Sequence, residues 1–265
     1  MTDTVLITGA SSGIGEALAR RFAGAGCNLV LVARSADKLK ALARELADTH
    51  GVKAWVSPAD LSQPGAAERL AAAMKRARRP IDILVNNAGV LEHGEFTAMR
   101  SSRHRELIDL NVTSLTEMLA HFLPPMQARG SGRVLNVASI AAFQPIPLLA
   151  TYAATKAFVL SLTESLSEEL QGTGVTVTAL CPGITATSML DQAQQGSSEL
   201  GQLPGFVVGT AEAVADEGFN ACMAGEVIRV PGVLNLAATL AGRGTPRWLV
   251  RRVTGALARR LKPRG

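Results

Sequence analysis

Three side chains whose types suit proton transfer lie close together in the middle of the chain. They are the hydroxyl of Ser139, the phenol of Tyr152, which is the only tyrosine, and the ammonium of Lys156. A phenol has an ordinary pKa of about 10, which is too high for a ready base near neutrality. A lysine four residues further along a helix lies on the same face, favours the phenolate and lowers that pKa. Taken alone, Tyr152 could equally be an ordinary aromatic residue on a helix face, so the surrounding elements decide.

The first of these elements is a glycine-rich turn near the N-terminus. Thr4–Thr8 is a short β-branched run typical of a buried parallel strand, and it leads through GASSGIG into a stretch with helical spacing. Such a turn lets backbone N–H groups and a helix N-terminus approach a pyrophosphate. The spacing here is GxxxGxG, set by Gly9, Gly13 and Gly15. The same glycines could instead serve only a tight turn.

The second predicted strand, Asn28–Ala33, indicates which dinucleotide is bound. In an NAD site a carboxylate near the end of this strand holds the ribose 2′-hydroxyl, whereas an arginine accommodates the 2′-phosphate of NADP. This strand ends in Ala33 followed by Arg34, so a guanidinium is available and no acid is. We therefore predict NADP(H), with NAD the less favoured cofactor. The alternative is that Arg34 is a solvated residue at the start of the next helix, near Asp37.

Ligand-facing residue types also follow the later strands. Asp60 could accept a hydrogen bond from the adenine amino group or cap the helix near Pro64. The carboxyl ends of strands are where ligands collect in open α/β sheets. The later strands are predicted at 52–57, 81–85, 133–139, 175–180 and 227–230, and helices at 38–50, 106–127, 151–171 and after Thr210, which is expected to cap its helix.

In chain order, TGASSGIG, Asp60-Leu61, NNAG, Asn111, Ser139, Tyr152-x-x-x-Lys156 and Pro182-Gly183 resemble the motif set of the short-chain dehydrogenase/reductase family. The resemblance covers about residues 4–231. It implies an α/β fold: a single-domain Rossmann fold with a doubly wound, seven-stranded parallel sheet and helices on both faces. The domain would occupy residues 1–231, and residues 232–265 would form a basic, helical C-terminal extension.

The resemblance also implies an activity, the interconversion of a ketone and a secondary alcohol by hydride transfer. Tyr152 would act as general acid/base, Lys156 would tune it and hold the nicotinamide ribose, and Ser139 would orient the carbonyl oxygen. Asn111 would kink its helix so that a backbone carbonyl holds a water reaching Lys156, although it could instead cap that helix. The implied cofactor contacts are Gly9, Ser11, Ser12, Gly13, Ile14 and Gly15 at the pyrophosphate, Arg34 at the 2′-phosphate, Asp60 and Leu61 at the adenine, Asn87, Ala88 and Gly89 on the ribose side, and Tyr152, Lys156, Pro182, Gly183, Thr185 and Thr187 near the nicotinamide.

Composition narrows the setting. Three isolated cysteines indicate a reducing compartment, and the histidine spacing predicts no metal site. We expect a cytoplasmic protein without a signal peptide, because the first predicted strand begins by residue 4. The net charge of +5 comes from residues 243–265, which hold eight basic residues and no acid and leave 19 basic against 22 acidic elsewhere.

Two segments leave alternatives open. Residues 188–209 could form a mobile lid over an apolar ligand or a plain surface loop. The basic extension could pack on the protein or on a partner subunit, or lie on an anionic membrane surface. Nucleic acid is the least favoured partner, because the segment offers one aromatic residue, Trp248, for base stacking. A homo-oligomer, dimer or tetramer, is implied by the family resemblance.

Two classes of function therefore compete. The first is an NADP(H)-dependent oxidoreductase acting on a small-molecule, apolar ketone or alcohol, with a 3-oxoacyl or other long-chain lipid reductase as a narrower version. The second is a non-catalytic dinucleotide sensor on the same fold. A sensor would be free to lose the tyrosine or the lysine, and this chain keeps both. Residue types suggest that Leu91, His93, Ile140, Gln144, Ile146, Leu149 and Met189 face the substrate.

Overall fold

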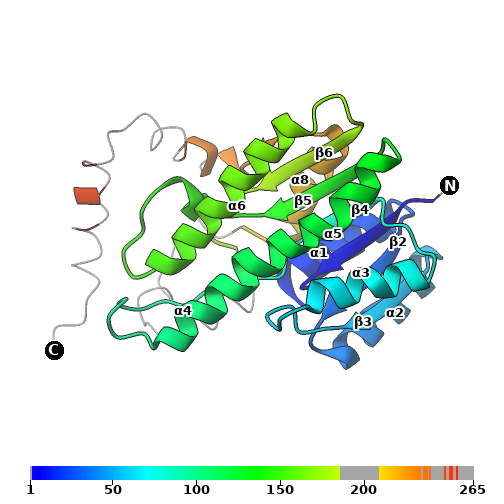
Figure 1. The fold of residues 1–265 in the computed structure, drawn as a ribbon, viewed down its shortest axis with the longest axis horizontal. Coiled ribbons are helices and arrows are strands. Elements are labelled where there is room, and N and C mark those ends of the chain that lie inside the picture. The colour runs from blue at the N-terminus through cyan, green and yellow to red at the C-terminus, as the bar shows by residue number, and fades with distance from the viewer. Residues whose placement is uncertain are drawn as a thin grey trace.

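Seven parallel strands form one sheet in the order β3-β2-β1-β4-β5-β6-β7 (Figure 1). The structure is a computed structural model, and it describes residues 2–185, 209–233, 235–237, 239, 248, 251–252 and 255. The strands are β1 (Thr4–Thr8), β2 (Asn28–Ala33), β3 (Ala54–Pro58), β4 (Ile83–Asn86), β5 (Gly132–Val137), β6 (Val175–Leu180) and β7 (Ile228–Arg229).

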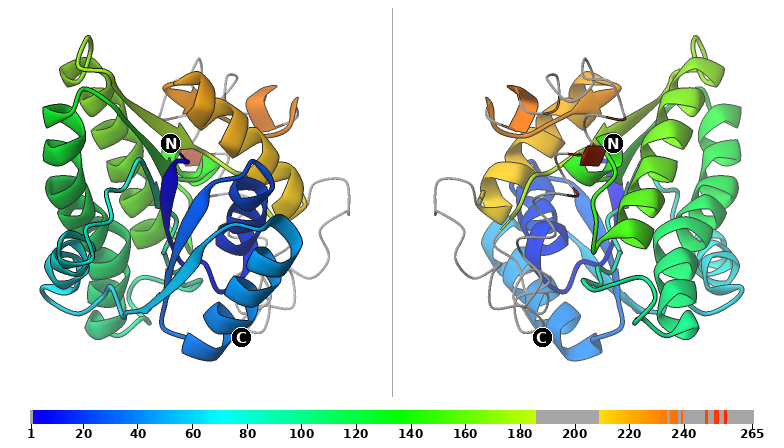
Figure 2. Two further views of the ribbon diagram at one scale, coloured as in Figure 1. Left: turned by 90° about the vertical axis from the view of Figure 1, so that its right-hand side faces the viewer. Right: turned by 90° about the vertical axis from the view of Figure 1, so that its left-hand side faces the viewer.

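Helices cover both faces of this sheet (Figure 2). The helices α3, α5 and α6 pack on one face, and α1, α2 and α8 pack on the other. The helices are α1 (Gly13–Gly24), α2 (Ala36–His50), α3 (Ala66–Arg76), α4 (Ser101–Ile108), α5 (Leu115–Ala128), α6 (Ala150–Glu169) and α8 (Ala211–Ala224), with a π-helical turn η1 (Asp109–Ser114) and a 3₁₀ turn η2 (Ile140–Phe143). The predicted doubly wound, seven-stranded parallel sheet is therefore confirmed.

The apolar strands explain why the sheet lies in the middle. All five residues of β1 are buried, as expected for a parallel strand covered on both faces. The strand order reverses at β1, since β2 and β3 lie on one side of it and β4 to β7 on the other. Such a switch point opens a crevice at the carboxyl ends of the strands. Arg34, Asn87, Ser139 and Pro182 follow the carboxyl ends of β2, β4, β5 and β6 at that edge.

The predicted helix over 106–127 is interrupted. It begins earlier, at Ser101, and the π-helical turn Asp109–Ser114 separates α4 from α5. A π-helical turn bonds each N–H to the carbonyl five residues back, and it occurs often at functional sites. The family resemblance implied a distortion at Asn111, and the turn is centred there.

The C-terminal end of the fold is described only in part. After β7 a helical turn begins, in which the N–H of Leu236 donates to the carbonyl of Gly232 at 3.0 Å. Trp248 is exposed, and the guanidinium of Arg252 lies 5.6 Å from its ring centroid. Within the described residues, no helix is both long and apolar enough to cross a membrane. Most of segment 243–265 lies outside the described residues.

One buried hydroxyl gives a stability prediction. Thr178 on β6 is fully buried, and its Oγ1 has no hydrogen-bond partner among the described residues. Because an unsatisfied buried hydroxyl costs free energy, we expect Thr178→Val to raise the free energy of unfolding by about 1 kcal/mol. The midpoint of thermal unfolding would rise by about 3 °C. Thermal unfolding followed by circular dichroism measures this.

The matched control is Thr163 on α6, also fully buried. Its Oγ1 donates to the carbonyl of Val159 at 2.7 Å and accepts from Asn136 Nδ2 at 3.0 Å. Thr163→Val leaves the Asn136 amide without that partner and should lower the midpoint. Equal losses from the two substitutions would contradict the assignment of an unsatisfied hydroxyl to Thr178.

Candidate active site

The three residues of the proton-transfer set meet at the carboxyl edge of the sheet. Ser139 follows β5, while Tyr152 and Lys156 lie one turn apart on α6. The Ser139 hydroxyl lies close enough to the Tyr152 phenol for a hydrogen bond that favours the phenolate. The Lys156 ammonium lies 5.8 Å from the Tyr152 ring centroid and donates to the carbonyl of Val137 at 2.8 Å. Ser139 Oγ also accepts from the N–H of Ala141 at 3.1 Å, so this hydroxyl serves both the turn and the phenol.

Burial sets the electrostatics of this set. Tyr152 and Lys156 are 8% and 6% exposed. Burial raises the pKa of Tyr152, and the hydrogen bond with Ser139 opposes that rise only in part. Burial also lowers the pKa of Lys156 to about 8. The net direction for the chain without a dinucleotide is therefore set by removal from water, and Lys156, whose ammonium bonds the Val137 carbonyl, is not among the causes of the shift. The lowering of the Tyr152 pKa by Lys156 stays a prediction.

Asn111 is held by bonds on two sides. Its Nδ2 donates to the carbonyl of Val90 at 2.9 Å, and its Oδ1 accepts from the N–H of Val90 at 2.9 Å. Nδ2 also lies 3.1 Å from Oγ1 of Thr155, which donates to the carbonyl of Tyr152 at 2.7 Å. Asn111 therefore ties the segment after β4 to α6 and is no helix cap. Sequence reasoning missed Thr155, whose only signal was a hydroxyl three residues after the tyrosine.

The glycine-rich turn closes tightly against the end of β4. Gly9 has φ of +67°, a conformation that favours glycine, and a Cβ on Gly15 would lie 2.3 Å from the Gly9 carbonyl oxygen. Asn87 Nδ2 donates to the carbonyl of Thr8 at 2.9 Å. Thr8 Oγ1 in turn accepts from the N–H groups of Asn87 and Ala88 at 2.9 and 3.0 Å. Asn87 and Ala88 thus brace the turn through Thr8, a residue that sequence reasoning missed.

The N-terminus of α1 opens toward this turn. Ser12 is the N-cap residue, and its side chain makes no capping bond. Ser11, Gly13 and Ile14 are half-buried, and Ile14 also packs on the core shared by α1 and α2. Backbone N–H groups at a helix N-terminus suit an anionic pyrophosphate. The contact of these residues with a pyrophosphate stays a prediction.

The predicted 2′-phosphate contact lies at the edge of the crevice. Arg34 follows β2, is exposed, and lowers the pKa of Asp60 as one of several causes. Ser35, the N-cap residue of α2, makes no side-chain capping bond. Its hydroxyl lies beside the guanidinium in sequence and at a helix N-terminus, where an anion is favoured. Sequence reasoning missed Ser35, although its position before α2 was a usable signal.

The residues predicted at the adenine are engaged within the protein. Asp60 accepts from the Ser62 hydroxyl at 2.7 Å and from its N–H at 3.1 Å, and the former is the main reason that its pKa is lowered. Asp60 therefore closes a turn, while the N-cap of α3 is Gly65. The Leu61 side chain is buried in the core. Any contact of Leu61 with a nucleotide would come from its backbone.

The remaining predicted residues flank Lys156. A Cβ on Gly89 would lie 3.6 Å from Lys156 Nζ, so these two positions are neighbours. Pro182 and Gly183 follow β6, and Thr185 Oγ1 donates to the Gly183 carbonyl at 3.1 Å. A Cβ on Gly183 would meet the Asn235 amide at 2.5 Å, so the C-terminal extension reaches this turn, which the sequence did not indicate. Thr187, and all of the predicted lid 188–209 except Gly209, lie outside the described residues.

An apolar wall stands beside the phenol. Leu91, Ile146 and Leu149, three of the predicted substrate-facing residues, pack against a small cluster of Ala141, Tyr152 and Ala153. His93 and Gln144 are half-buried on the same two segments, Ile140 packs on the main core, and Met189 lies outside the described residues. The described wall brings apolar carbon, and no charged side chain, against the tyrosine.

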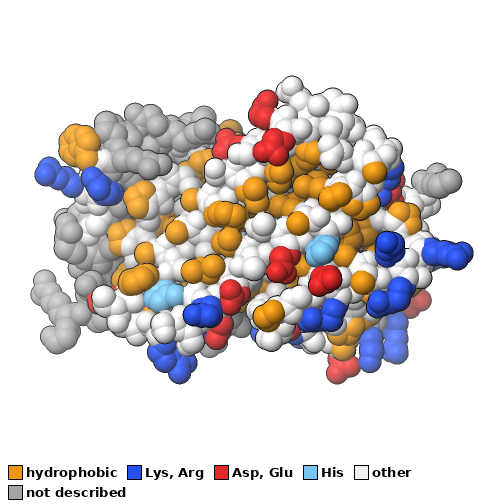
Figure 3. Space-filling view, viewed as in Figure 1, with side chains coloured by type: hydrophobic (Ala, Val, Ile, Leu, Met, Phe, Trp, Pro, Cys, Tyr) orange, Lys and Arg blue, Asp and Glu red, His pale blue; other side chains and the backbone are white. Residues whose placement is uncertain are grey.

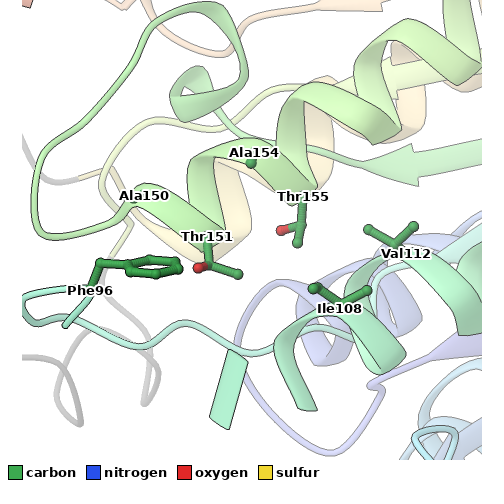
Figure 4. A pocket seen from close by; sticks show the side chains of 7 residues that line it. All are labelled: Phe96, Ile108, Val112, Ala150, Thr151, Ala154 and Thr155. Atoms are coloured by element: carbon green, nitrogen blue, oxygen red, sulfur yellow. The ribbon is translucent and has the colours of Figure 1, made fainter. Parts of the chain in front are cut away.

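A separate groove lies on the outer side of α6 (Figure 4). Its walls come from α4 and η1 on one side and the first turns of α6 on the other, and hydrophobic side chains gather across this face over α5 and α6 (Figure 3). Phe96, Ile108 and Phe158 are 61%, 44% and 41% exposed. The residues lining the groove are Phe96, Ile108, Val112, Ala150, Thr151, Ala154 and Thr155.

Residues 3–198 match the sequence profile of the short chain dehydrogenase family. The chain belongs to this family of oxidoreductases, whose fold binds a nicotinamide dinucleotide.

Among its relatives, a 7beta-hydroxysteroid dehydrogenase of Collinsella aerofaciens is 34% identical over 215 residues, 81% of this chain and 81% of that protein. A short-chain dehydrogenase from Sphingobium yanoikuyae in complex with NADPH superposes with a TM-score of 0.82 and 34% identity, covering 99% of this chain and 97% of that one. The bulky-bulky ketone specific alcohol dehydrogenase from Comamonas testosteroni superposes with a TM-score of 0.77 and 30% identity, covering 92% of this chain and 95% of that one.

Proposed function

We propose that this protein is an NADP(H)-dependent oxidoreductase that interconverts a bulky apolar ketone and its secondary alcohol. The observation that carries the proposal is the meeting of Ser139, Tyr152 and Lys156 beside the glycine-rich turn, with an apolar wall next to the phenol. Both the 7beta-hydroxysteroid dehydrogenase and the bulky-bulky ketone specific alcohol dehydrogenase are named for large carbonyl or alcohol substrates. A wall of leucine and isoleucine suits such a substrate.

Each residue has a role that follows from its surroundings. The bound nicotinamide supplies or accepts the hydride. Tyr152, whose pKa is raised by burial, stays a phenol near neutrality and can donate its proton to the developing alkoxide. Ser139, which lies beside the phenol, can turn its single O–H toward the same substrate oxygen and stabilise negative charge there. Lys156 provides a positive charge one turn from the phenol, and Asn111 positions the backbone on which Lys156 and Tyr152 rely.

The choice of NADP(H) over NAD rests on the end of β2. Arg34 is exposed there, Ser35 offers a hydroxyl, and no carboxylate follows the strand directly. A guanidinium binds a phosphate with two charge-assisted hydrogen bonds, whereas a carboxylate would repel it. A relative bound to NADPH supports this choice.

The proposal is tested with purified protein, NADPH or NADH, and a graded panel of ketones. The panel should run from acetone through cyclic and aryl ketones to a ketosteroid, with a 3-oxoacyl thioester as a separate arm. We expect NADPH oxidation that becomes more efficient with substrate size. Preference for the thioester would favour a lipid reductase, and the absence of oxidation with every substrate, despite NADPH binding, would favour the dinucleotide sensor.

The pH dependence follows from the two shifted groups. Lys156 has its pKa lowered to about 8, so its charge is present below that pH and is lost above it. Tyr152 has its pKa raised and remains a proton donor across this range. We expect kcat/KM for ketone reduction to be flat at neutral pH and to fall as the pH rises through about 8. In Lys156→Arg any residual activity should lack this fall, because arginine keeps its charge. If the same fall in kcat/KM persisted in this variant, it could not be caused by the loss of charge at Lys156.

We also propose that the protein is a homo-oligomer that uses the apolar face of Figure 4. The exposed Phe96, Ile108 and Phe158 would then be covered by a second subunit. Replacing Ala154, in the groove, by arginine should shift the protein toward monomer in analytical ultracentrifugation. Ala41→Arg, at an exposed position of α2 on the opposite face of the sheet, tests whether added charge alone does so. A monomeric wild-type protein would contradict the proposal.

The cytoplasmic location and the membrane contact of segment 243–265 stay predictions from sequence.

A further inference from the structure

The histidine of α4 bridges two segments that lie far apart in sequence. His104 Nδ1 lies 2.7 Å from Oγ1 of Thr151, and Nε2 lies 3.2 Å from the carbonyl oxygen of Phe96. A carbonyl only accepts, so Nε2 is the donor, and Nδ1 of the neutral ring then accepts from the Thr151 hydroxyl. The ring also stacks on Phe96, with centroids 4.3 Å apart. In Figure 4 the Phe96 ring points toward Thr151.

The preceding residue holds the other end of the same segment. Arg103 bonds and pairs with Glu92, and it also pairs with Glu106 one turn further along α4. The hydrogen bond with Glu92 is the main reason that the pKa of Arg103 is raised. Two adjacent residues of α4 therefore fasten residues 92–96 at both ends. Such a double attachment fixes where the segment lies relative to α6.

Residues 92–96 are in turn joined to the loop before α6. The N–H of Gly94 donates to the carbonyl of Leu148 at 2.9 Å. Leu148 has φ of +68°, a left-handed conformation that a leucine adopts only when its surroundings hold it there. Leu91, beside one segment, and Leu149, beside Leu148, both pack against the cluster that contains Tyr152. The apolar wall is therefore built from two loops that contact each other and are both attached to α4.

We propose that His104 is a positioning residue that sets the shape of the substrate side of the site and hence the preference for bulky ketones. The inference rests on the proposed ketone reduction. His104 acts by fixing Phe96, next to one loop, and Thr151, in the first turn of α6 directly after the other loop. Without this bridge the two loops separate, and the apolar wall loses its fit to a large substrate.

The kinetic test compares His104→Leu with His104→Gln, which keeps one donor and one acceptor. In His104→Leu we expect KM for a ketosteroid to rise about tenfold, the effect of losing one to two side-chain hydrogen bonds. The kcat for that substrate, and both constants for acetone or another small ketone, should change less than about twofold. His104→Gln should recover most of the ketosteroid KM. Equal losses for large and small ketones in His104→Leu would overturn the inference.

A second readout does not depend on turnover. Hydrogen exchange at the Gly94 amide, which is bonded to Leu148, should become faster in His104→Leu and in Thr151→Val, and the double variant should exchange no faster than the faster single variant. Additive acceleration, or unchanged exchange in His104→Leu, would overturn the bridge. If the wild-type protein reduces no ketone, the proposed function fails, while coupled exchange at Gly94 would still establish the bridge.

Discussion

We expect Tyr152→Phe to lower kcat for NADPH-dependent ketone reduction by about a thousandfold, within the range that a positioned general acid supplies. The substitution removes one oxygen and leaves the ring, which packs with Ala141 and Ala153. The phenol is the group whose raised pKa keeps a proton available beside the carbonyl oxygen. Single-turnover rates measured with saturating NADPH isolate the loss to the chemical step.

Its controls separate chemistry from folding and binding. Tyr152→Phe should bind NADPH as tightly as the wild type and unfold at a similar temperature, because its ring remains in place. Ser139→Ala should lower kcat by less, about a hundredfold, since it removes one hydrogen-bond donor to the developing charge. Turnover that survives in folded, NADPH-binding Tyr152→Phe would rule out the phenol as the proton donor.

The second large effect is expected at Arg34. We expect Arg34→Ala to lower kcat/KM for NADPH by about a hundredfold, the loss of a bidentate, charge-assisted contact with a phosphate. The value for NADH should stay within about threefold, because NADH lacks that phosphate. Arg34→Asp should go further and reverse the preference, since a carboxylate repels the 2′-phosphate and can bind a 2′-hydroxyl. Initial rates with each cofactor at saturating ketone measure both effects.

Arg44 provides the matched comparison, because it is an exposed arginine on helix α2, about two turns beyond the start of the helix that follows Arg34. Arg44→Ala should leave kcat/KM unchanged for both NADPH and NADH. If Arg34→Ala weakened NADPH and NADH equally, the arginine would act on the fold or on a shared part of the dinucleotide, and the 2′-phosphate contact would be wrong.

Local patterns in the sequence were enough to place the elements. The predicted bounds of β1, β2 and β6 agree with the structure at both ends, because each is an apolar or β-branched run set between turn residues. Thr210 accepts from the N–H of Ala213 at 3.2 Å, as a predicted cap should. The glycine-rich turn and the set of Ser139, Tyr152 and Lys156 could be predicted because their spacing along the chain is visible in the sequence itself.

What the sequence did not contain is the environment of those residues. The direction of the shift in the Tyr152 pKa depends on how far the fold buries the phenol. The sequence shows only that a lysine lies four residues away, and it does not show the burial. Thr8, Thr155 and Asn235 matter through contacts across the fold, in which residues of ordinary type meet backbone groups from distant segments. Bridges such as that of His104 follow from tertiary packing, which no periodicity encodes.

The most direct test of the account follows a labelled hydride. Protein is incubated with a bulky ketone and NADPH carrying deuterium at C4 of the nicotinamide, separately on each face, and the alcohol is analysed by mass spectrometry. Direct transfer predicts one deuterium on the carbinol carbon when one face of the nicotinamide is labelled and none when the other face is labelled. With Tyr152→Phe, no labelled alcohol should form over the same time. An alcohol that takes its carbinol hydrogen from solvent D₂O, or no alcohol at all, would contradict the proposed reaction.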